Sequence, residues 1–450
     1  FRGILAMDLM NTFNKFKERT LRGYSGLAIK NSIHQISTTI VTKIGSLIFI
    51  AIIARVLMPE LFGLYSLVFF TIFTFASFSD MGVATSLTRY ISLTLAKGDQ
   101  KKAKSYFVYH FKIKVILTTI SFLALVVSAK FISTTYYQKP IFLALLVGSL
   151  FVIMLSVIGF IESFFRSSNQ FQGIFFKELF FQITRVLIVP VLVIILLKYA
   201  LTQEMSLVII VSAIFIPYAL TLIFFILLAK KKILFLEVNA EPLSDNEKKD
   251  VRRFIFPLSI SLICYTLLDQ IDIILLGKFV TSEFIGYYSA AFFLISPATA
   301  IAALSTALFP IFSRLEGEQL KRGLKRSLVA IFILSILFTV LIVILAPLIV
   351  KIAYGDNYSD AIGLLRLGSL VIVPSSMIGI YINFFVSRGK TKLTAKLLIA
   401  LTIVKLVVGY ILVLNFVKIS LYAATVGVIL ARIIIEYLQL GFLALFSKSP

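Results

Sequence analysis

The sequence predicts an all-α integral membrane protein of about twelve transmembrane helices, arranged as two pseudo-symmetric six-helix bundles. Of its 450 residues, 59% are hydrophobic and only 14% are charged, and the mean hydropathy is +1.01. Soluble domains carry roughly 25% charged residues, so this excess of apolar side chains requires lipid as a solvent. The apolar segments are continuous rather than alternating, which excludes a membrane β-barrel.

Each predicted span is an apolar segment long enough to cross a bilayer. A hydrocarbon core about 30 Å thick needs roughly 20 apolar residues per helix. Twelve segments meet this length, at 33–55, 62–88, 113–130, 140–162, 173–197, 206–229, 254–277, 284–309, 327–350, 362–386, 394–415 and 421–446. The loops on the outer side are all short, so there is no room for the folded outer domain that an extracytoplasmic polymerase usually needs.

The distribution of Lys and Arg predicts the orientation. The formal net charge is +23, which in a soluble protein would suggest nucleic-acid binding. Here the loop 230–253 alone holds seven basic residues, as many as all the loops of the opposite face together. Cytoplasmic loops carry such an excess in membrane proteins. We therefore expect a multi-pass cell-membrane protein with both termini in the cytoplasm and no nucleic-acid partner.

The two halves of the chain resemble each other. The segment ARVLMPELFGLYSLVFF (54–70) aligns without gaps to GKFVTSEFIGYYSAAFF (277–293). Six of the 17 positions are identical, namely Glu60/Glu283, Gly63/Gly286, Tyr65/Tyr288, Ser66/Ser289, Phe69/Phe292 and Phe70/Phe293. Two further pairs of segments correspond at nearly the same offset, and one of them sets Arg185 opposite Lys405. Because six is an even number of spans, the halves share one orientation in the membrane.

This repeat divides the chain into parts. The expected parts are a basic cytoplasmic leader (1–32), an N-terminal six-helix bundle (33–229), a cytoplasmic linker (230–253), a C-terminal six-helix bundle (254–446) and a cytoplasmic tail (447–450). The leader lacks the apolar core and cleavage site of a signal peptide. The mixed charges of the linker are typical of a solvated hinge.

Polar and charged side chains inside the predicted spans are the candidate substrate-binding residues. A charge at the bilayer centre costs on the order of 3 kcal/mol and usually faces a cavity or a partner. In the first span, Lys43 forms a polar stripe on one helical face together with Gln35, Thr39 and Ser46. An apolar residue would meet any purely structural need at Lys43, so we favour a functional role for it.

Further charges lie in other spans. The candidates for a cavity are Asp80 in the second span, Arg185 in the fifth and Lys405 in the eleventh. Asp269 and Asp272 lie toward the outer part of the seventh span, where they are candidates for a coupling-cation site, with Na⁺ or H⁺ as the ion. Pairing of these two carboxylates with a neighbouring cation is an equally good explanation. Arg432 and Glu436 are one turn apart in the last span, which favours a structural ion pair.

The sequence carries no enzyme or metal signature. Its one cysteine, Cys264, and its two histidines, His34 and His110, are too few for a thiolate or imidazole metal site. A P-loop (GxxxxGK[ST]) is absent, which argues against direct ATP coupling. We therefore expect neither a catalytic residue nor a cofactor.

The string ARVLMPELFGLYS, followed by FSDMGVATSLTRYIS and a basic loop, resembles the polysaccharide flippases of the Wzx type. LLDQIDIILLGKFVTSEFIGYYS fits the seventh helix of the same family and the start of its eighth. The resemblance implies a V-shaped pair of bundles around a central cavity, which places Lys43, Asp80, Asp269 and Asp272 on cavity helices. It implies a substrate of oligosaccharide linked to a polyisoprenoid (di)phosphate, with membrane lipids, a polysaccharide polymerase and glycosyltransferases as partners.

Three other function classes are alternatives. An ion-coupled multidrug antiporter of the same superfamily shares the architecture and would use the carboxylates of the seventh span on cationic drugs. The surplus of Lys and Arg in the spans argues against this alternative, because a cationic cavity repels such drugs. A membrane glycosyltransferase or polymerase is disfavoured by the missing outer domain. A major-facilitator transporter is disfavoured because its Gly-x-x-x-Asp-Arg/Lys-x-Gly loop is absent after the second span.

Overall fold

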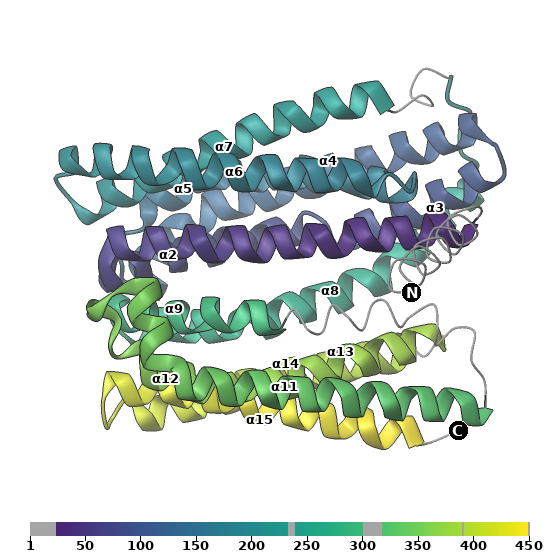
Figure 1. The fold of residues 1–450 in the computed structure, drawn as a ribbon. Coiled ribbons are helices and arrows are strands. Elements are labelled where there is room, and N and C mark those ends of the chain that lie inside the picture. Colours follow the sequence, from purple (N-terminus) through teal and green to yellow (C-terminus); the bar gives the residue numbers. More distant parts are fainter. Residues whose placement is uncertain (1–23, 233–238, 300–316, 389–390, 449–450) are drawn as a thin grey trace, which may run out of the picture.

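A computed structural model describes residues 24–232, 239–299, 317–388 and 391–448, and within these ranges the chain forms helices and no strands. The helices run side by side along one direction (Figure 1). Those of the N-terminal half, purple to teal, form one layer of the view, and those of the C-terminal half, green to yellow, form the other. The predicted all-α class and the division into two bundles are confirmed.

Within its described residues, the N-terminal half contains six helices of the α type. They are α2 (Tyr24–Phe78), α3 (Val83–Ala96), α4 (Gln100–Lys130) with the π-helical turn η1 (Phe131–Tyr137), α5 (Phe142–Ser167), α6 (Phe171–Leu196) with the 3-10 turn η2 (Leu197–Tyr199), and α7 (Gln203–Lys232). Helix α2 is kinked at Met58, whose φ is 60°, directly before Pro59. Proline cannot continue the hydrogen-bond ladder of a helix, so α2 consists of two spans that meet at this kink.

The second predicted span, 62–88, is wrong at its far end. Helix α2 stops at Phe78, and α3 begins as a separate helix at Val83. Gly82 lies between them with a φ of 81°, a left-handed conformation that glycine adopts without strain. Apolar residues such as Val83 and Leu87 follow Gly82, so the hydropathy of the sequence did not indicate where the span ends.

The C-terminal half repeats this plan. Its helices are α8 (Asp245–Phe279), α9 (Ser282–Thr299), α11 (Gly317–Tyr354) with the 3-10 turn η5 (Asp356–Tyr358), α12 (Ala361–Gly368), η6 (Ser369–Val371), α13 (Ile372–Ser387), α14 (Thr391–Phe416) and α15 (Leu421–Lys448). The expected linker 230–253 is shorter than predicted, because α8 already begins at Asp245. A capping box between Ser244 and Glu247 starts this helix, and its Ser-x-x-Glu pattern was visible in the sequence.

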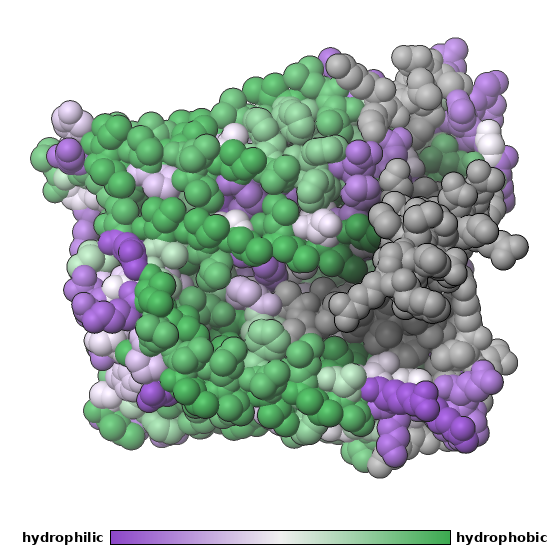
Figure 2. Space-filling model, viewed as in Figure 1, coloured by the Kyte–Doolittle hydropathy of each residue, from purple (hydrophilic) through white to green (hydrophobic). Residues whose placement is uncertain are grey.

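The described residues include ten helical segments that are long and apolar enough to cross a membrane. One of them, Asn31–Phe78, contains both spans of α2, and the shorter α9 starts a further span, so the prediction of twelve holds. Apolar residues cover the middle of the molecule and polar residues gather at its two ends (Figure 2). The leader 1–32 lies mostly outside the described residues.

The repeated segments of the two halves pack against each other with local twofold symmetry. Gly63 of α2 faces the backbone of α9, and a Cβ added to it would lie 1.7 Å from the carbonyl oxygen of Ser282. Gly286 of α9 faces α2 in the same way, with an added Cβ 2.0 Å from the carbonyl oxygen of Pro59. Pro59 and Ser282 are themselves equivalent in the alignment of the repeats. The contact is therefore the same when the two halves are exchanged.

We call the end of the molecule that contains this contact the sealed end. Side chains join the halves there as well. The Tyr358 hydroxyl donates to the carbonyl oxygen of Ala54 over 2.8 Å, and the Lys139 ammonium donates to that of Gly277 over 2.7 Å. The second bond places a positive charge at the C-terminus of α8, where helix carbonyls lack internal partners. Both described ends of the chain, at α2 and α15, lie at the opposite end (Figure 1).

Candidate functional site

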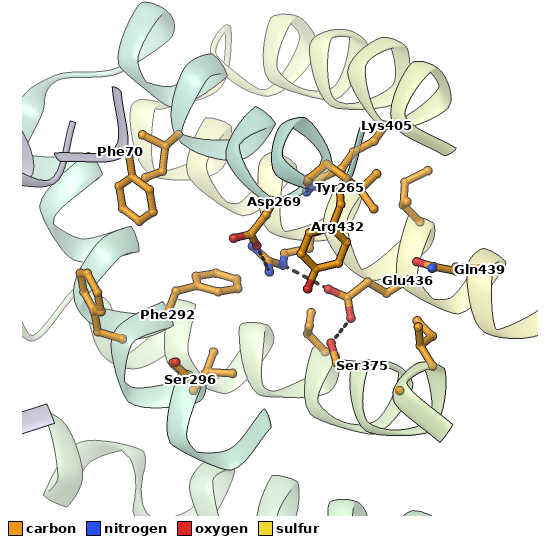
Figure 3. Close-up of a pocket in the computed structure, with 18 of the residues that line it drawn as sticks. Phe70, Tyr265, Asp269, Phe292, Ser296, Ser375, Lys405, Arg432, Glu436 and Gln439 are labelled. Carbon is orange, nitrogen blue, oxygen red and sulfur yellow. Dashed lines mark hydrogen bonds and ion pairs between the residues drawn. The ribbon is translucent and has the colours of Figure 1, made fainter. Parts of the chain in front are cut away.

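A cavity of about 520 Å³ lies between the two halves. Helices α8, α9, α13, α14 and α15 of the C-terminal half provide most of its wall. The N-terminal half contributes two residues of α2, Lys43 from the first span and Phe70 from the second. Figure 3 shows the charged side chains of α8, α14 and α15 grouped together, with the Phe292 ring beside Arg432 and Phe70 of α2 farther from the group.

Aromatic rings separate the cavity from the sealed end. Phe70 and Phe293 are equivalent residues of the repeat, and their ring centres are 6.3 Å apart at an angle of 29°. Each lies seven residues, about two helical turns, beyond the glycine of its own half. The tight backbone contact at Gly63 and Gly286 is thus followed by a stacked pair of rings, and the cavity begins behind that pair.

Lys43 points into the cavity without an ion-pair partner. Its ammonium donates to the hydroxyl of Ser296 on α9 over 2.7 Å. Within the described ranges, no carboxylate lies in salt-bridge distance of this nitrogen, although Asp269 is near enough to act on it electrostatically. The remaining residues of the predicted stripe do not line the cavity: Thr39 bonds back to the carbonyl oxygen of Gln35 in its own helix.

Five charged residues of the C-terminal half form one network. Arg432 lies at its centre, 3.0 Å from Asp269, 3.0 Å from Asp272 and 3.2 Å from Glu436. Lys405 is 2.9 Å from Asp272. The side chain of Asp272 is 1% exposed and that of Lys405 is 3% exposed, whereas that of Asp269 is 55% exposed and borders the cavity. The network alone has two cations and three carboxylates, and Lys43, which forms no salt bridge with it, brings the total formal charge of these six residues to zero.

This balance changes the expectation of a cationic cavity. Lys405 and Arg432 are each neutralised by carboxylates, so neither of them offers a free positive charge. Burying charges is costly unless each one is paired and hydrogen-bonded. The network meets this condition, since Asp272 also accepts from the hydroxyl of Tyr288 over 3.0 Å, and Lys405 also donates to the carbonyl oxygen of Leu268 over 2.6 Å. Lys43 is half-buried and is the cation of the cavity lining that forms no salt bridge among the described residues.

Arg185 occupies the equivalent place in the N-terminal half. It extends from α6 onto α2, donates to the hydroxyl of Ser46 over 3.0 Å, and its guanidinium lies 4.3 Å from the centre of the Phe49 ring. With the offset of the repeat, Ser46 and Phe49 correspond to Asp269 and Asp272. Both halves therefore place a cation of their fifth span on their first span, but only the second half supplies carboxylates there. Arg185 does not line the cavity.

A buried polar chain continues from this arginine along α6. Gln182 accepts from Arg185 over 2.7 Å and donates to Glu178 over 2.6 Å. Lys177 joins Glu178 to Glu162 of α5, at 2.9 and 2.6 Å. The sequence analysis overlooked this chain, although the spacing of Glu178, Gln182 and Arg185 places them on one helical face.

The remaining candidates lie elsewhere. Asp80 falls in the turn after α2, outside the cavity lining, and pairs with Lys114 of α4 at 2.8 Å. Asp269 and Asp272 both contact Arg432, so the guanidinium competes with any cation at these carboxylates; their role in coupling stays a prediction. In the described ranges no three His, Cys, Asp or Glu side chains are arranged to hold a metal ion.

Comparison with known protein families identifies the chain. The family model described as "Polysaccharide biosynthesis protein" matches residues 28–316. The chain belongs to this family. A second model, MatE, matches residues 257–411 of the C-terminal half. No curated protein matches the chain.

Several solved structures share the fold at low sequence identity. An inward-facing multidrug resistance MATE transporter of the MOP superfamily is 14% identical, with a TM-score of 0.69 over 92% of this chain and 99% of that one. The lipid II flippase MurJ in an inward closed conformation is 15% identical, with a TM-score of 0.66 over 92% and 87%. An outward-facing MATE transporter reaches 0.57 at 16% identity over 95% and 97%. These similarities establish the fold of the chain.

Several cavity residues were missing from the sequence-based candidates. Glu436 and Arg432 were interpreted as a structural pair; the pair is real, but both residues also line the cavity. Tyr288 and Ser296 of α9 and Gln439 of α15 were not singled out for a site. Tyr288 is an identical position of the repeat, and Gln439 continues the helical face of Arg432 and Glu436, so these two had a detectable signal.

Proposed function

We propose that the protein is a flippase that moves a polyisoprenoid-(di)phosphate-linked oligosaccharide from the cytoplasmic to the outer leaflet by alternating access, for assembly of a cell-surface glycan. The observation that carries the proposal is the unpaired ammonium of Lys43 in a cavity whose other cations are neutralised. A phosphate group is a natural partner for such a cation inside a membrane-spanning bundle, because charge-assisted hydrogen bonds are strong. The substrate leaves chemically unchanged, so no catalytic residue is needed.

The opposite wall of the cavity suits the sugar part. Asp269 and Glu436 offer hydrogen-bond acceptors to hydroxyl groups, and Gln439 offers both a donor and acceptors. Tyr265 and Phe292 provide flat apolar surfaces in the same wall. The phosphate would thus lie on the α2 side beside Lys43, and the glycan would lie against the C-terminal half, where the carboxylates are.

The distribution of basic loops supports the direction of transport. The end opposite the sealed end carries the basic residues of 97–104 and of 248–253, which would attract anionic lipid-linked substrate to the cytoplasmic face. We therefore assign the sealed end to the outside and both termini to the cytoplasm. The higher TM-score with the inward-facing than with the outward-facing MATE transporter agrees with this orientation.

Ion-coupled drug export is the second candidate, because the MatE model matches the half that contains the network. The balanced charge of the cavity weakens the argument that cationic drugs are repelled. Equilibrium binding to the purified protein separates the two functions. We expect the tailless methyl ester of a disaccharide diphosphate to bind wild type and to bind Lys43→Ala about tenfold more weakly, the value of one charge-assisted contact. Binding of ethidium but not of the diphosphate would favour the antiporter.

Two parts of the proposal concern partners. A Na⁺ or H⁺ gradient is one candidate energy source for transport, and Asp269 is the carboxylate of the network that such an ion could reach. Consumption of the product by a polysaccharide polymerase on the outer face is another. Flipping measured in sealed vesicles with and without an imposed Na⁺ or pH gradient distinguishes them, because coupled transport accelerates with the gradient.

A further inference from the structure

A second, smaller pocket opens beside the cavity in the seam between the two halves. It has a volume of about 150 Å³ and lies among α2, η1 and α8. Ten residues line it, namely Phe70, Thr71, Thr74, Phe75, Ile132, Tyr136, Tyr137, Gln270, Ile273 and Ile274. Phe70 and Ile273 line the large cavity as well, so the two spaces meet at these side chains.

The pocket is apolar and borders the lipid. Thr74 of α2, Ile132 and Tyr136 of η1 and Ile274 of α8 are all partly exposed, which places its rim at the surface of the membrane-spanning region. Both threonines use their hydroxyls within α2: Thr74, for example, donates to the carbonyl oxygen of Phe70 over 2.8 Å. A chain that enters this pocket therefore meets mainly carbon atoms.

Gln270 is the exception in this lining. Its side chain is 9% exposed, and its Oε1 atom is buried without a hydrogen-bond partner. Leaving a buried polar atom unpaired costs about 1 to 3 kcal/mol. A ligand that forms a hydrogen bond with the Gln270 amide would remove this cost. Rotation of the amide exchanges its oxygen and its N–H₂ group, so Gln270 can also donate to an ester or phosphate oxygen.

We propose that this pocket holds the first isoprene unit of the carrier lipid while its phosphate lies in the cavity; the inference rests on the proposed flippase function. Apolar cavities of about 150 Å³ take up a molecule the size of benzene, which is close to a five-carbon isoprene unit. Gln270 then contacts the oxygen that joins isoprene to phosphate. The rest of the tail continues past Thr74 and Ile274 into the bilayer, so it never crosses the polar cavity.

Photo-crosslinking of the full chain in lipid nanodiscs tests this placement. The probe is a disaccharide diphosphate on a farnesyl tail whose first isoprene unit carries a diazirine. We expect labelled peptides from 70–75, 132–137 and 270–274. Labelling spread over lipid-facing helices in general, or labelling of the same peptides by a diazirine phosphatidylcholine that the farnesyl probe does not displace, would overturn the proposal.

Variants separate this inference from the proposed function. Thr74→Trp fills the pocket and Gln270→Leu removes its amide, whereas Phe73→Trp adds the same ring on the lipid side of the same helix, where Phe73 is 39% exposed. The two pocket variants should weaken binding of the farnesyl probe about threefold to tenfold, the usual range of packing and hydrogen-bond effects in lipid, and the control should not. Binding of the tailless methyl ester should stay unchanged in Thr74→Trp and Phe73→Trp, whereas Gln270→Leu should weaken it as well, because the methyl ester keeps the bridging oxygen that Gln270 contacts. If the tailless ligand binds but the pocket variants have no effect, only the inference fails; if neither ligand binds wild type, the flippase proposal fails with it.

Discussion

Replacing Gly63 by alanine should open the sealed end. The added Cβ would lie 1.7 Å from the carbonyl oxygen of Ser282, and ordinary contact needs about 3.4 Å, so the two backbones have to separate by about 1.7 Å. Overpacking costs about 1 to 3 kcal/mol, and the upper figure applies here because both groups in conflict belong to the backbone. About 3 kcal/mol shifts the balance between sealed and open states by roughly 150-fold. Gly286→Ala should act in the same way, because its Cβ meets Pro59 across the same local symmetry.

Spin labels can report this opening. Leu201 and Ile419 are 91% and 75% exposed in loops of the sealed end, one in each half, and Cys264 is the only native cysteine to remove first. Double electron–electron resonance between labels at these sites should show a new population at longer distance in Gly63→Ala. Gly159→Ala is the matched control, because nothing lies within 4 Å of its added Cβ. Equal distance distributions in both variants would refute the assignment of Gly63 to the closure.

Three further outcomes follow from the contacts of the site and the sealed end. Lys43→Arg should retain diphosphate binding within about threefold, because guanidinium also pairs with phosphate; a loss as large as that of Lys43→Ala in the same titration would show that shape rather than charge matters. Asp272→Asn should destabilise the fold by about 3 to 5 kcal/mol, since it leaves the Lys405 ammonium buried without its carboxylate, and Lys405→Met should restore part of the melting temperature; no rescue would contradict the pairing. Tyr358→Phe removes the bond to Ala54 and should favour the open population by about fivefold in the same spin-label measurement, as expected for about 1 kcal/mol, whereas an unchanged ratio would show that this bond does not hold the end closed.

Hydropathy and the repeat predicted the architecture because both arise from physical demands on the whole chain. Apolar length predicts spans wherever lipid is the solvent, and the identity of Gly63 with Gly286 reflects a real contact between equivalent backbones. Boundaries that depend on local chemistry were less visible. The turn at Gly82 follows Ser79 and Asp80, and the capping box at Ser244 lies in a charged segment, so both boundaries depend on local residue chemistry that a count of apolar length does not capture.

The site was predictable in its residue types but not in their partners. Lys43 was a candidate because a charge inside a membrane span is costly and usually faces a cavity or a partner, and Lys43 does line the cavity. Nothing in the sequence indicates that Arg432 of the last span meets Asp269 and Asp272 of the seventh, since such pairing depends on how distant helices pack. For the same reason Asp80, which has a similar sequence context, lies outside the cavity beside another lysine.

The most direct test of the central claim is flipping of a fluorescent lipid-linked oligosaccharide in reconstituted liposomes. Membrane-impermeant quenching follows the fraction of label that reaches the outer leaflet. The flippase proposal predicts a rate well above that of empty liposomes in wild type and a rate near the empty control in Lys43→Ala, with Gly159→Ala unaffected. Wild-type flipping no faster than in empty liposomes would contradict it.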